Sequence, residues 1–190
     1  MSYASQEELL ALAQALRERC FRRGEFRLTS GLAARYYYDG KQVTLHPRWA
    51  EIIGRLLLGP IVAWGAEAVG GMATGAIPIA MAVSLAAFHG QVRVLPVFYV
   101  REERKEHGVR DTVAGEELVR GLKVAIVEDV VTTGTSSLRA IRAVEEIGCR
   151  VVGVAALLER HEGGGDEIRR RGYPFFRLFY TDPEGNLHMA

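Results

Sequence analysis

Two neighbouring carboxylates, Glu128 and Asp129, are the side chains of this sequence best placed to do chemistry. They follow an apolar run at residues 124–127 and precede a turn of small hydroxyl and glycine residues at 132–136. Carboxylates suit ribose hydroxyls, which donate hydrogen bonds to them. Hydroxyls and free backbone N–H groups at the start of a helix suit a phosphate. A buried strand and turn with no ligand is the alternative, but two adjacent acids seldom end such a strand without a partner. The pattern therefore predicts a site for a phosphorylated sugar.

The composition is that of one ordinary globular domain. A chain of 190 residues can bury a sizeable core, and 48% hydrophobic with 25% charged residues is typical of soluble proteins. The net charge of +1 provides no broad basic field for nucleic acid or an anionic membrane. The first residues do not form a signal peptide, and no apolar run reaches the ~18 residues of a membrane span. We therefore expect a cytoplasmic protein that binds neither nucleic acid nor membranes.

The remaining reactive side chains form no catalytic or metal-binding motif. Cys20 and Cys149 lie far apart in the sequence and read as thiols in a reducing compartment. The five histidines are scattered, without the spacing of a zinc site. The dinucleotide fingerprint, the P-loop and the G-x-S-x-G elbow are all missing from the sequence. These observations disfavour zinc enzymes, nucleotide-dependent kinases and serine hydrolases.

Apolar periodicity predicts the elements that must position the acidic pair. Residues 6–20 have helical spacing, and Pro47 suits the first position of a second helix. Asp39-Gly40 is a hairpin turn signal, so we expect residues 43–45 to pair back onto residues 36–38.

From residue 66 onward, predicted strands and helices alternate. The expected strands are 66–70, 92–100, 122–127, 151–158 and 175–180, and the expected helices are 76–88 and 135–147. Glycines 163–165 are expected to form a flexible connection. This alternation predicts an α/β fold with a mostly parallel sheet that is covered on both faces. Ligands of such sheets bind beyond the carboxyl ends of the strands, where residues 70–75, residues 128–136 and Arg160 would meet.

The segment Glu128-Asp129-Val-Val-Thr-Thr-Gly-Thr-Ser136 resembles the signature of the type I phosphoribosyltransferases, which bind phosphoribosyl pyrophosphate (PRPP). The resemblance implies the fold of that family, a mostly parallel sheet flanked by helices with a small N-terminal lobe, or hood. We expect one domain, with residues 1–45 contributing the hood and residues 46–190 the core. The resemblance also implies Mg²⁺ as the cofactor, held mainly through PRPP and water and not directly by side chains.

The same resemblance implies which residues contact PRPP. In this family the loop at residues 70–75 holds the pyrophosphate, often through an unusual peptide conformation that falls at 73–75 here. Many orotate enzymes have a lysine where Gly75 stands, so backbone N–H groups would carry more of the contact. The expected PRPP-binding residues are Ala73, Thr74, Gly75, Arg101, Lys105, His107, Glu128, Asp129, Thr132, Thr133, Gly134, Thr135 and Ser136. Of these, Lys105 and Asp129 are expected to be catalytic.

The charged segment from Arg101 to Gly115 has no secondary-structure period. A solvated surface is one reading of such a run, and an active-site lid is the other. Its start, Arg-Glu-Glu-Arg-Lys-Glu-His-Gly, resembles the Arg-Lys-Glu-x-Lys-x-His-Gly loop of orotate phosphoribosyltransferases. By that match Lys105 is the mobile catalytic lysine, while Glu102 stands where a second lysine is common. The family loop enters the partner subunit's site, so we expect a homodimer in which this loop does the same.

The resemblance extends to the base. Gly24-Glu-Phe-Arg-Leu-Thr-Ser-Gly31 resembles the opening of the orotate enzymes, although Thr29 replaces their lysine. Leu158-Glu-Arg160 matches the strand end whose arginine pairs with the orotate carboxylate, a planar group that fits a guanidinium. Hypoxanthine-type enzymes carry a basic aspartate where Thr132 stands, and a threonine cannot replace it. The expected orotate-binding residues are Phe26, Thr29, Thr132 and Arg160.

The resemblance therefore implies an orotate phosphoribosyltransferase of pyrimidine biosynthesis. Such an enzyme converts orotate and PRPP to orotidine 5′-monophosphate and pyrophosphate. A transferase for another base, such as xanthine or adenine, is one alternative, and a PRPP-sensing regulator that binds nucleic acid is the other. Lys105 and the near-neutral charge favour an enzyme over a regulator.

Overall fold

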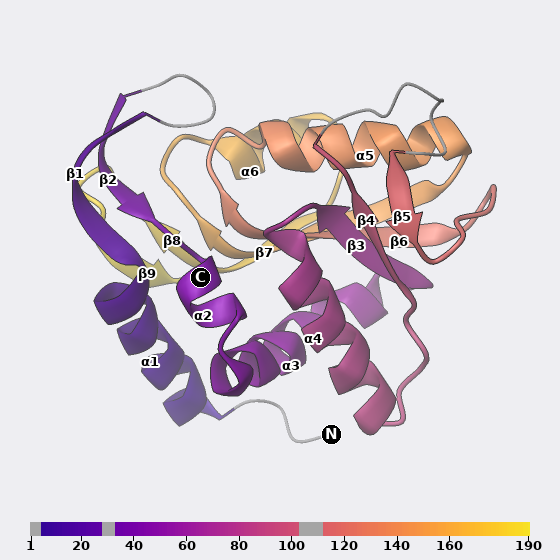
Figure 1. Ribbon diagram of the computed structural model, residues 1–190, viewed down its shortest axis with the longest axis horizontal. Helices are drawn as coiled ribbons and strands as arrows, with labels where there is room; N and C mark the ends of the chain where they lie inside the picture. The colour runs from indigo at the N-terminus through magenta and orange to yellow at the C-terminus, as the bar shows by residue number, and fades with distance from the viewer. Residues whose placement is uncertain (1–4, 28–32, 103–111) are drawn as a thin grey trace.

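The computed structural model describes residues 5–27, 33–102 and 112–190. A seven-stranded sheet in the order β5-β4-β3-β6-β7-β8-β9 forms its centre, and a separate hairpin, β1-β2, stands beside that sheet (Figure 1). The strands are β1 (Phe21–Arg27), β2 (Ala33–Tyr38), β3 (Ala68–Met72), β4 (Val97–Val100), β5 (Val113–Gly115), β6 (Lys123–Val131), β7 (Arg150–Glu159), β8 (Phe175–Thr181) and β9 (Leu187–Met189). The helices are α1 (Gln6–Ala15) with a π-helical extension η1 (Leu16–Cys20), α2 (Lys41–Thr44), α3 (Pro47–Ala63), α4 (Ala76–His89), α5 (Thr135–Ile147) and α6 (Gly164–Arg170).

The sheet is parallel from β4 to β8, and only its edge strands β5 and β9 run antiparallel to their neighbours. Helices α5 and α6 cover one face, and α3 and α4 cover the other (Figure 1). Each face has its own apolar cluster, one built with α1, α3 and α4 and the other with α5 and α6. The prediction of a mostly parallel sheet covered on both faces is confirmed. None of the described helices combines the length and apolar character that a membrane span requires.

The local sequence determines where helix α5, which lies next to the predicted site, begins and ends. It has the predicted bounds, Thr135–Ile147, and lies between Gly134 and Gly148. Both glycines have left-handed backbones, with φ of 78° and 99°, a conformation that glycine adopts without a steric penalty. Ala140 and Val144 lie on one face of the helix and are buried. The packing of this face against the sheet fixes the position of the helix and therefore of its first turn.

The strands that follow β3 in the sequence are placed on both sides of it, with β4 on one side and β6 on the other. Helix α4 carries the chain from β3 to β4 on one side, and the chain then returns to place β6 on the other side of β3. The connections at the carboxyl ends of β3 and β6 therefore diverge and leave a crevice, which is where parallel α/β sheets bind ligands.

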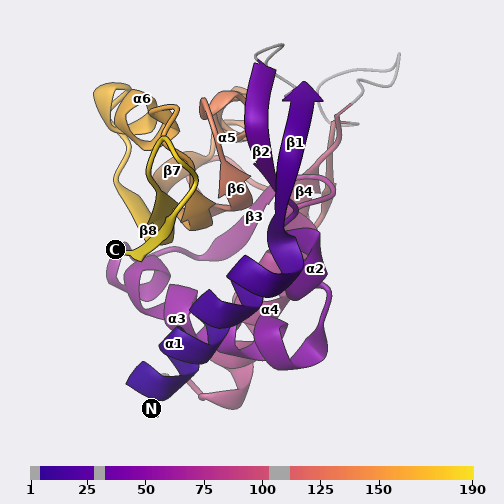
Figure 2. The same ribbon diagram turned by 90° about the vertical axis from the view of Figure 1, so that its left-hand side faces the viewer.

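The N-terminal hairpin corrects one prediction. Residues 43–45 do not pair back onto residues 36–38, because residues 41–44 form α2 and β2 pairs with β1 instead, with Phe21 opposite Tyr38. Aromatic packing accounts for this choice, since the Phe21 and Tyr38 rings lie 5.1 Å apart between their centroids. Figure 2 shows the hairpin rising from the end of α1, with α2 at its base.

Three other predicted boundaries were wrong. Strand β6 does not end before the acidic pair but continues to Val131, because β7 pairs with it as far as Glu159. Strand β4 begins at Val97 and not at residue 92. The glycines at 163–165 do not form a flexible connection, since Gly163 caps α6 and the next two glycines begin that helix.

Candidate functional site

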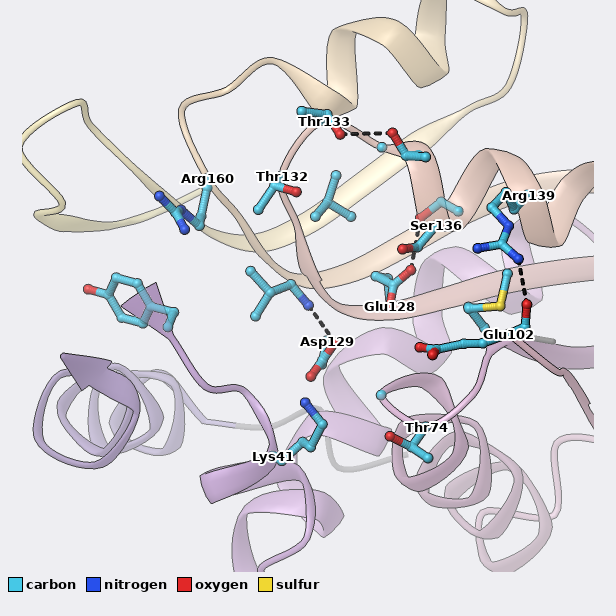
Figure 3. A pocket seen from close by; sticks show the side chains of 18 of the residues that line it. Lys41, Thr74, Glu102, Glu128, Asp129, Thr132, Thr133, Ser136, Arg139 and Arg160 are labelled. Carbon is cyan, nitrogen blue, oxygen red and sulfur yellow. Dashed lines mark hydrogen bonds between the residues drawn. The ribbon is translucent and has the colours of Figure 1, made fainter. Parts of the chain in front are cut away.

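A pocket of about 540 Å³ opens at the carboxyl ends of β3, β6 and β7 and is closed on one side by β2 and α2. Its walls come from segments that are far apart in the sequence but adjacent in the fold (Figure 3). The lining residues include Phe26, Tyr37, Lys41, Ala73, Thr74, Gly75, Glu128, Asp129, Thr132, Thr133, Gly134, Thr135, Ser136, Arg139 and Arg160. This is the crevice that the strand order predicts.

The two carboxylates form the floor of the pocket. Glu128 and Asp129 are only 6% and 8% exposed, and each accepts a hydrogen bond from a residue nearby in the sequence. The Ser137 hydroxyl donates to Glu128 Oε2 over 3.2 Å, and the Val130 N–H donates to Asp129 Oδ1 over 2.9 Å. Burial raises the pKa of both carboxyls, and the charge of Asp129 raises the pKa of Glu128 further. The floor therefore favours ligand groups that bring hydroxyl donors or positive charge.

The turn between β6 and α5 forms the upper wall. Thr133 and Thr135 share a hydrogen bond of 2.9 Å between their hydroxyls, and Thr135 and Ser136 are exposed at the pocket. Helix α5 has no side-chain cap, so its first N–H groups remain available to a ligand at its positive end. Hydroxyls and helix N–H groups together make this wall suitable for a phosphate.

The turn is supported from behind by the start of α6. The Gly164 N–H donates to the Thr132 carbonyl over 2.8 Å. A Cβ atom at residue 164 would lie 2.4 Å from that carbonyl oxygen, so only glycine permits this approach. The glycine run that we expected to be flexible therefore holds the predicted phosphate-binding turn in place.

The loop after β3 forms the opposite wall. The peptide bond between Ala73 and Thr74 is cis, which is an unusual peptide conformation at the place where the family resemblance implies one. The Ala73 N–H donates to the Val100 carbonyl over 2.7 Å, which ties the loop to the end of β4. A Cβ atom at Gly75 would lie 2.5 Å from Asp129 Oδ1. This loop therefore approaches the acidic pair with its backbone.

Arg160 brings a buried positive charge to the far end of the pocket. Its side chain is 1% exposed, Nη2 lies 2.6 Å from Glu162 Oε1, and the guanidinium lies over the Tyr36 ring. That ion pair is close but poorly aligned, and none of the three guanidinium nitrogens has a well-formed hydrogen bond within the described part of the chain. Unused donors on a buried guanidinium are expensive unless a ligand satisfies them. A planar carboxylate is the ligand group that fits them best.

The pocket unites most of the residues that the sequence singled out. The carboxylates, the 73–75 loop, the 132–136 turn, Phe26 and Arg160 all line it. Arg101 does not line it, and its guanidinium lies 5.9 Å from the centroid of the Tyr99 ring. Three further candidates, Thr29, Lys105 and His107, lie outside the described residues.

Sequence reasoning did not identify two cationic residues of the pocket, Lys41 and Arg139. Arg139 projects from the first turns of α5 and donates to the Glu102 carbonyl over 2.7 Å. Lys41 starts α2 and extends toward Asp129 (Figure 3). One signal pointed to Lys41, namely that only three of the 24 basic residues are lysines.

Comparisons with known proteins agree on one family. The sequence matches the phosphoribosyl transferase domain family over residues 39–173. It is 43% identical to an orotate phosphoribosyltransferase of Sorangium cellulosum, in a match covering 92% of this chain and 91% of the relative.

Solved structures give the same result. The crystal structure of Mycobacterium tuberculosis orotate phosphoribosyltransferase in complex with Fe(III) dicitrate superposes with a TM-score of 0.80 at 35% identity, covering 94% of this chain and 99% of that chain. The structure of the same mycobacterial enzyme in complex with PRPP superposes with a TM-score of 0.75 at 29% identity, covering 95% and 93% of the two chains.

Proposed function

The chain belongs to the orotate phosphoribosyltransferase family, and we propose that its β3–β6–β7 pocket transfers the 5-phosphoribosyl group from PRPP to orotate. The products are orotidine 5′-monophosphate and pyrophosphate, and the reaction serves pyrimidine biosynthesis. One observation carries the proposal: a single pocket holds an acidic pair, a helix-start hydroxyl turn and a buried guanidinium with unused donors. These three features match the ribose hydroxyls, the 5′-phosphate and the orotate carboxylate respectively.

Each substrate group then has a place in the pocket. Glu128 and Asp129 accept hydrogen bonds from the ribose hydroxyls, and residues 132–136 hold the 5′-phosphate. Residues 73–75 hold the pyrophosphate with their backbone. Arg160 pairs with the orotate carboxylate, while Phe26, Thr29 and Thr132 line the base site. Arg101 and His107 belong, with Lys105, to the charged loop that approaches the pyrophosphate.

The chemistry requires charge at two places. When the anomeric carbon leaves the pyrophosphate oxygen and bonds to the base nitrogen, the ribose ring becomes cationic and the pyrophosphate gains negative charge. The buried carboxylate of Asp129 stabilises the cationic ring, and the ammonium of Lys105 stabilises the leaving group. Both effects are stronger once the charged loop excludes water.

The pocket also fits Mg²⁺ carried by the substrate. The floor holds two buried carboxyl groups whose pKa values are raised by burial, so a nearby cation would favour their charged forms. Mg²⁺ in phosphate-transfer sites keeps several waters and is held largely by substrate phosphates. When bound, the ion neutralises the developing charge on the pyrophosphate. Glu128 and Asp129 favour its presence through their charge, and PRPP and water supply its ligands.

We also propose a homodimer in which the charged loop that begins at Arg101 reaches the partner's site. The predicted end of this loop at Gly115 was wrong, because residues 113–115 form β5 and pair with β4 in this chain's own sheet. The exposed side of α4 offers a surface for the partner subunit. Met81, Leu85 and Phe88 lie along this side, and they are 43%, 47% and 62% exposed. In this assembly residues 1–45 act as the hood over the core of residues 46–190. The free thiols Cys20 and Cys149 suit the reducing cytoplasm.

An absorbance assay with purified protein tests the activity. The protein is mixed with PRPP, Mg²⁺ and, in separate reactions, orotate, xanthine, hypoxanthine or adenine. We expect turnover with orotate alone, and turnover of a purine instead would assign a different base. Failure of PRPP to bind in calorimetry would reject the proposed site as a whole.

A mixing experiment tests the loop and the dimer. Lys105→Ala should lower kcat by at least about 100-fold, the scale of losing one preorganised transition-state donor, while PRPP affinity changes little. Mixing Lys105→Ala protomers with Asp129→Asn protomers should restore part of the activity, because hybrid dimers contain one intact site. If affinity capture through a tag on one variant shows mixed dimers and no activity returns, loop donation is wrong.

A further inference from the structure

Lys41 reaches the pocket from the N-terminal side of the molecule. Strand β2 ends at Tyr38, the chain turns at Asp39-Gly40, and α2 begins at Lys41. This turn packs directly on the acidic pair, because a Cβ atom at Gly40 would lie 3.0 Å from both Cβ and Oδ2 of Asp129. Figure 3 shows the Lys41 side chain extending toward Asp129, with Thr74 on the same side of that carboxylate.

The 73–75 loop contacts the other oxygen of the same carboxylate. The position of a Cβ atom at Gly75 is 2.5 Å from Asp129 Oδ1, whereas Gly40 approaches Oδ2. Asp129 is therefore held between the turn that carries Lys41 and the loop that we assign to the pyrophosphate. A pyrophosphate seated on that loop would lie beside the ammonium group of Lys41.

The ammonium of Lys41 has no close partner within the described residues. Its one ion pair there is with Asp39 Oδ1 at 3.7 Å, and its side chain is 42% exposed. Two other cations line the pocket in the described part of the chain. Arg139 donates to the Glu102 carbonyl, and Arg160, beside Glu162, is the residue that we assign to the orotate carboxylate. Burial alone would lower the pKa of Lys41, but the nearby charge of Asp129, with smaller contributions from Tyr37 and Asp39, raises it overall. The Lys41 ammonium is therefore charged, and its N–H groups can donate further hydrogen bonds to a ligand.

We propose that Lys41 is a substrate-contacting residue that binds the diphosphate of PRPP from the hood side of the pocket. The inference rests on the proposed function and adds a second source of positive charge to the pyrophosphate end. A lysine ammonium offers three donors on a flexible stem, which suits the several oxygens of a diphosphate. The 5′-phosphate has its own wall at residues 132–136, across the acidic pair from the 73–75 loop, so Lys41 distinguishes the two ends of PRPP.

The test compares ligands with and without a diphosphate. Calorimetry with wild type and Lys41→Met measures binding of PRPP, of orotidine 5′-monophosphate and of inorganic pyrophosphate in the presence of Mg²⁺. Lys41→Met should weaken PRPP and pyrophosphate binding by at least about tenfold, as expected for loss of a charge-assisted hydrogen bond. Binding of orotidine 5′-monophosphate should change by less than about threefold, because this ligand keeps the ribose and the 5′-phosphate but lacks the diphosphate.

Lys123→Met is the matched control. Lys123 is exposed at the start of β6, the end of that strand opposite the pocket, so its loss should leave all three affinities unchanged. Lys41→Arg should recover most of the PRPP affinity because it retains the charge. If Lys41→Met does not fold, Lys41→Gln replaces it in the same comparison.

Three results would overturn the inference. Unchanged PRPP binding by Lys41→Met would remove the lysine from the site. Equal losses for PRPP and orotidine 5′-monophosphate would mean that Lys41 acts only by positioning Asp129, which faces the ribose in both ligands. A matching loss in Lys123→Met would indicate a general charge effect. All three leave the proposed function intact, because that is tested by PRPP binding and orotate turnover in the wild type.

Discussion

The guanidinium of Arg160 lies 4.4 Å from the centroid of the Tyr36 ring, so a residue of the N-terminal hairpin positions a charged residue of the central sheet. The ring is itself fixed at its far end. Its hydroxyl lies 2.7 Å from His161 Nδ1 and 3.0 Å from Thr181 Oγ1, and it donates to the Asp182 carbonyl over 3.2 Å. Tyr36 therefore helps to hold the guanidinium of Arg160 in place beside the pocket.

Tyr36→Leu should weaken orotate binding more than PRPP binding. Loss of a desolvated cation–π contact costs about 2 kcal/mol, which corresponds to a KM for orotate raised by roughly 10- to 30-fold. Tyr180→Leu is a control, since Arg177 lies 4.5 Å from the Tyr180 ring centroid and neither residue lines the pocket. Steady-state kinetics with each substrate varied in turn measures both effects. A larger change in the KM for PRPP than for orotate would contradict the assignment.

Replacing Arg160 should weaken the binding of orotate more than the binding of PRPP. Arg160→Met alone leaves the largely buried Glu162 carboxylate without its cation, at a cost of up to about 3–5 kcal/mol in folding free energy. The double variant Arg160→Met/Glu162→Gln avoids this cost and is the better probe. Orotate affinity should fall by at least about tenfold, the value of one hydrogen bond to a charged group. Calorimetry with PRPP provides the comparison, and an equal loss there would show that Arg160 is not specific for the base.

Gly75→Ala should weaken PRPP binding at the 73–75 loop, which we assign to the pyrophosphate. The added methyl group would lie 2.5 Å from Asp129 Oδ1, so either the loop or the carboxylate must move. We expect PRPP affinity to fall by at least about tenfold, a loss of ~1.4 kcal/mol. Gly59→Ala is the matched control, because a Cβ atom at that position in α3 meets nothing within 4 Å. This control should keep PRPP affinity and gain about 0.5–1 kcal/mol of stability through better helix propensity.

Glu128→Gln should stabilise the ligand-free protein increasingly as pH rises. Burial, aided by the charge of Asp129, raises the pKa of Glu128 well above 4.5 in the folded state. Below pH 4.5 the carboxyl is protonated in both folded and unfolded chains, so the substitution changes little. As pH rises from there toward the folded-state pKa, only the unfolded chain ionises, and the wild type loses stability that the glutamine variant keeps.

Calorimetric melting of both proteins at several pH values measures this difference. Each kcal/mol corresponds to about 2–4 °C in Tm for a chain of this size. The Tm advantage of Glu128→Gln should be larger at about pH 8 than at about pH 5. A constant difference across this range would mean that Glu128 is not held protonated by its surroundings. The same variant should lose PRPP affinity, since an amide is a poorer acceptor for the ribose hydroxyls.

The central sheet could be predicted because its strands carry their own signals. Strand β7 (Arg150–Glu159) and helix α5 lie within a residue of their predicted bounds, since an apolar run or a helical period marks each of them. The location of the pocket walls could be predicted from these strands, because parallel strands place their carboxyl ends at one edge of the sheet. Edge strands β5 and β9 have only three residues each, too few for a period to be seen.

Contacts between distant segments could not be predicted in the same way. Tyr36 meets His161, which is 125 residues away, and nothing near Tyr36 in the sequence indicates that partner. The sequence predicts a hairpin turn at Asp39-Gly40, and such a turn gives no reason to place Lys41 in the pocket. The backbone of Gly40 is instead right-handed helical, with φ of −57° and ψ of −26°, and this conformation starts α2. Local propensity was therefore overridden by the packing of the hairpin on the sheet.

The hydroxyls of Tyr36 and Tyr38 tie the hairpin to the final strands, where Tyr38 donates to the Gly185 carbonyl over 3.1 Å. The β8–β9 turn at residues 182–186 thus supports the end of the pocket that we assign to the base, although none of its residues lines the pocket. Under the proposed function, we expect mutations in that turn to change nucleobase preference by shifting Tyr36 under Arg160, and to leave the acidic pair on β6 in place. Such mutations would then alter base selectivity and spare the reaction itself.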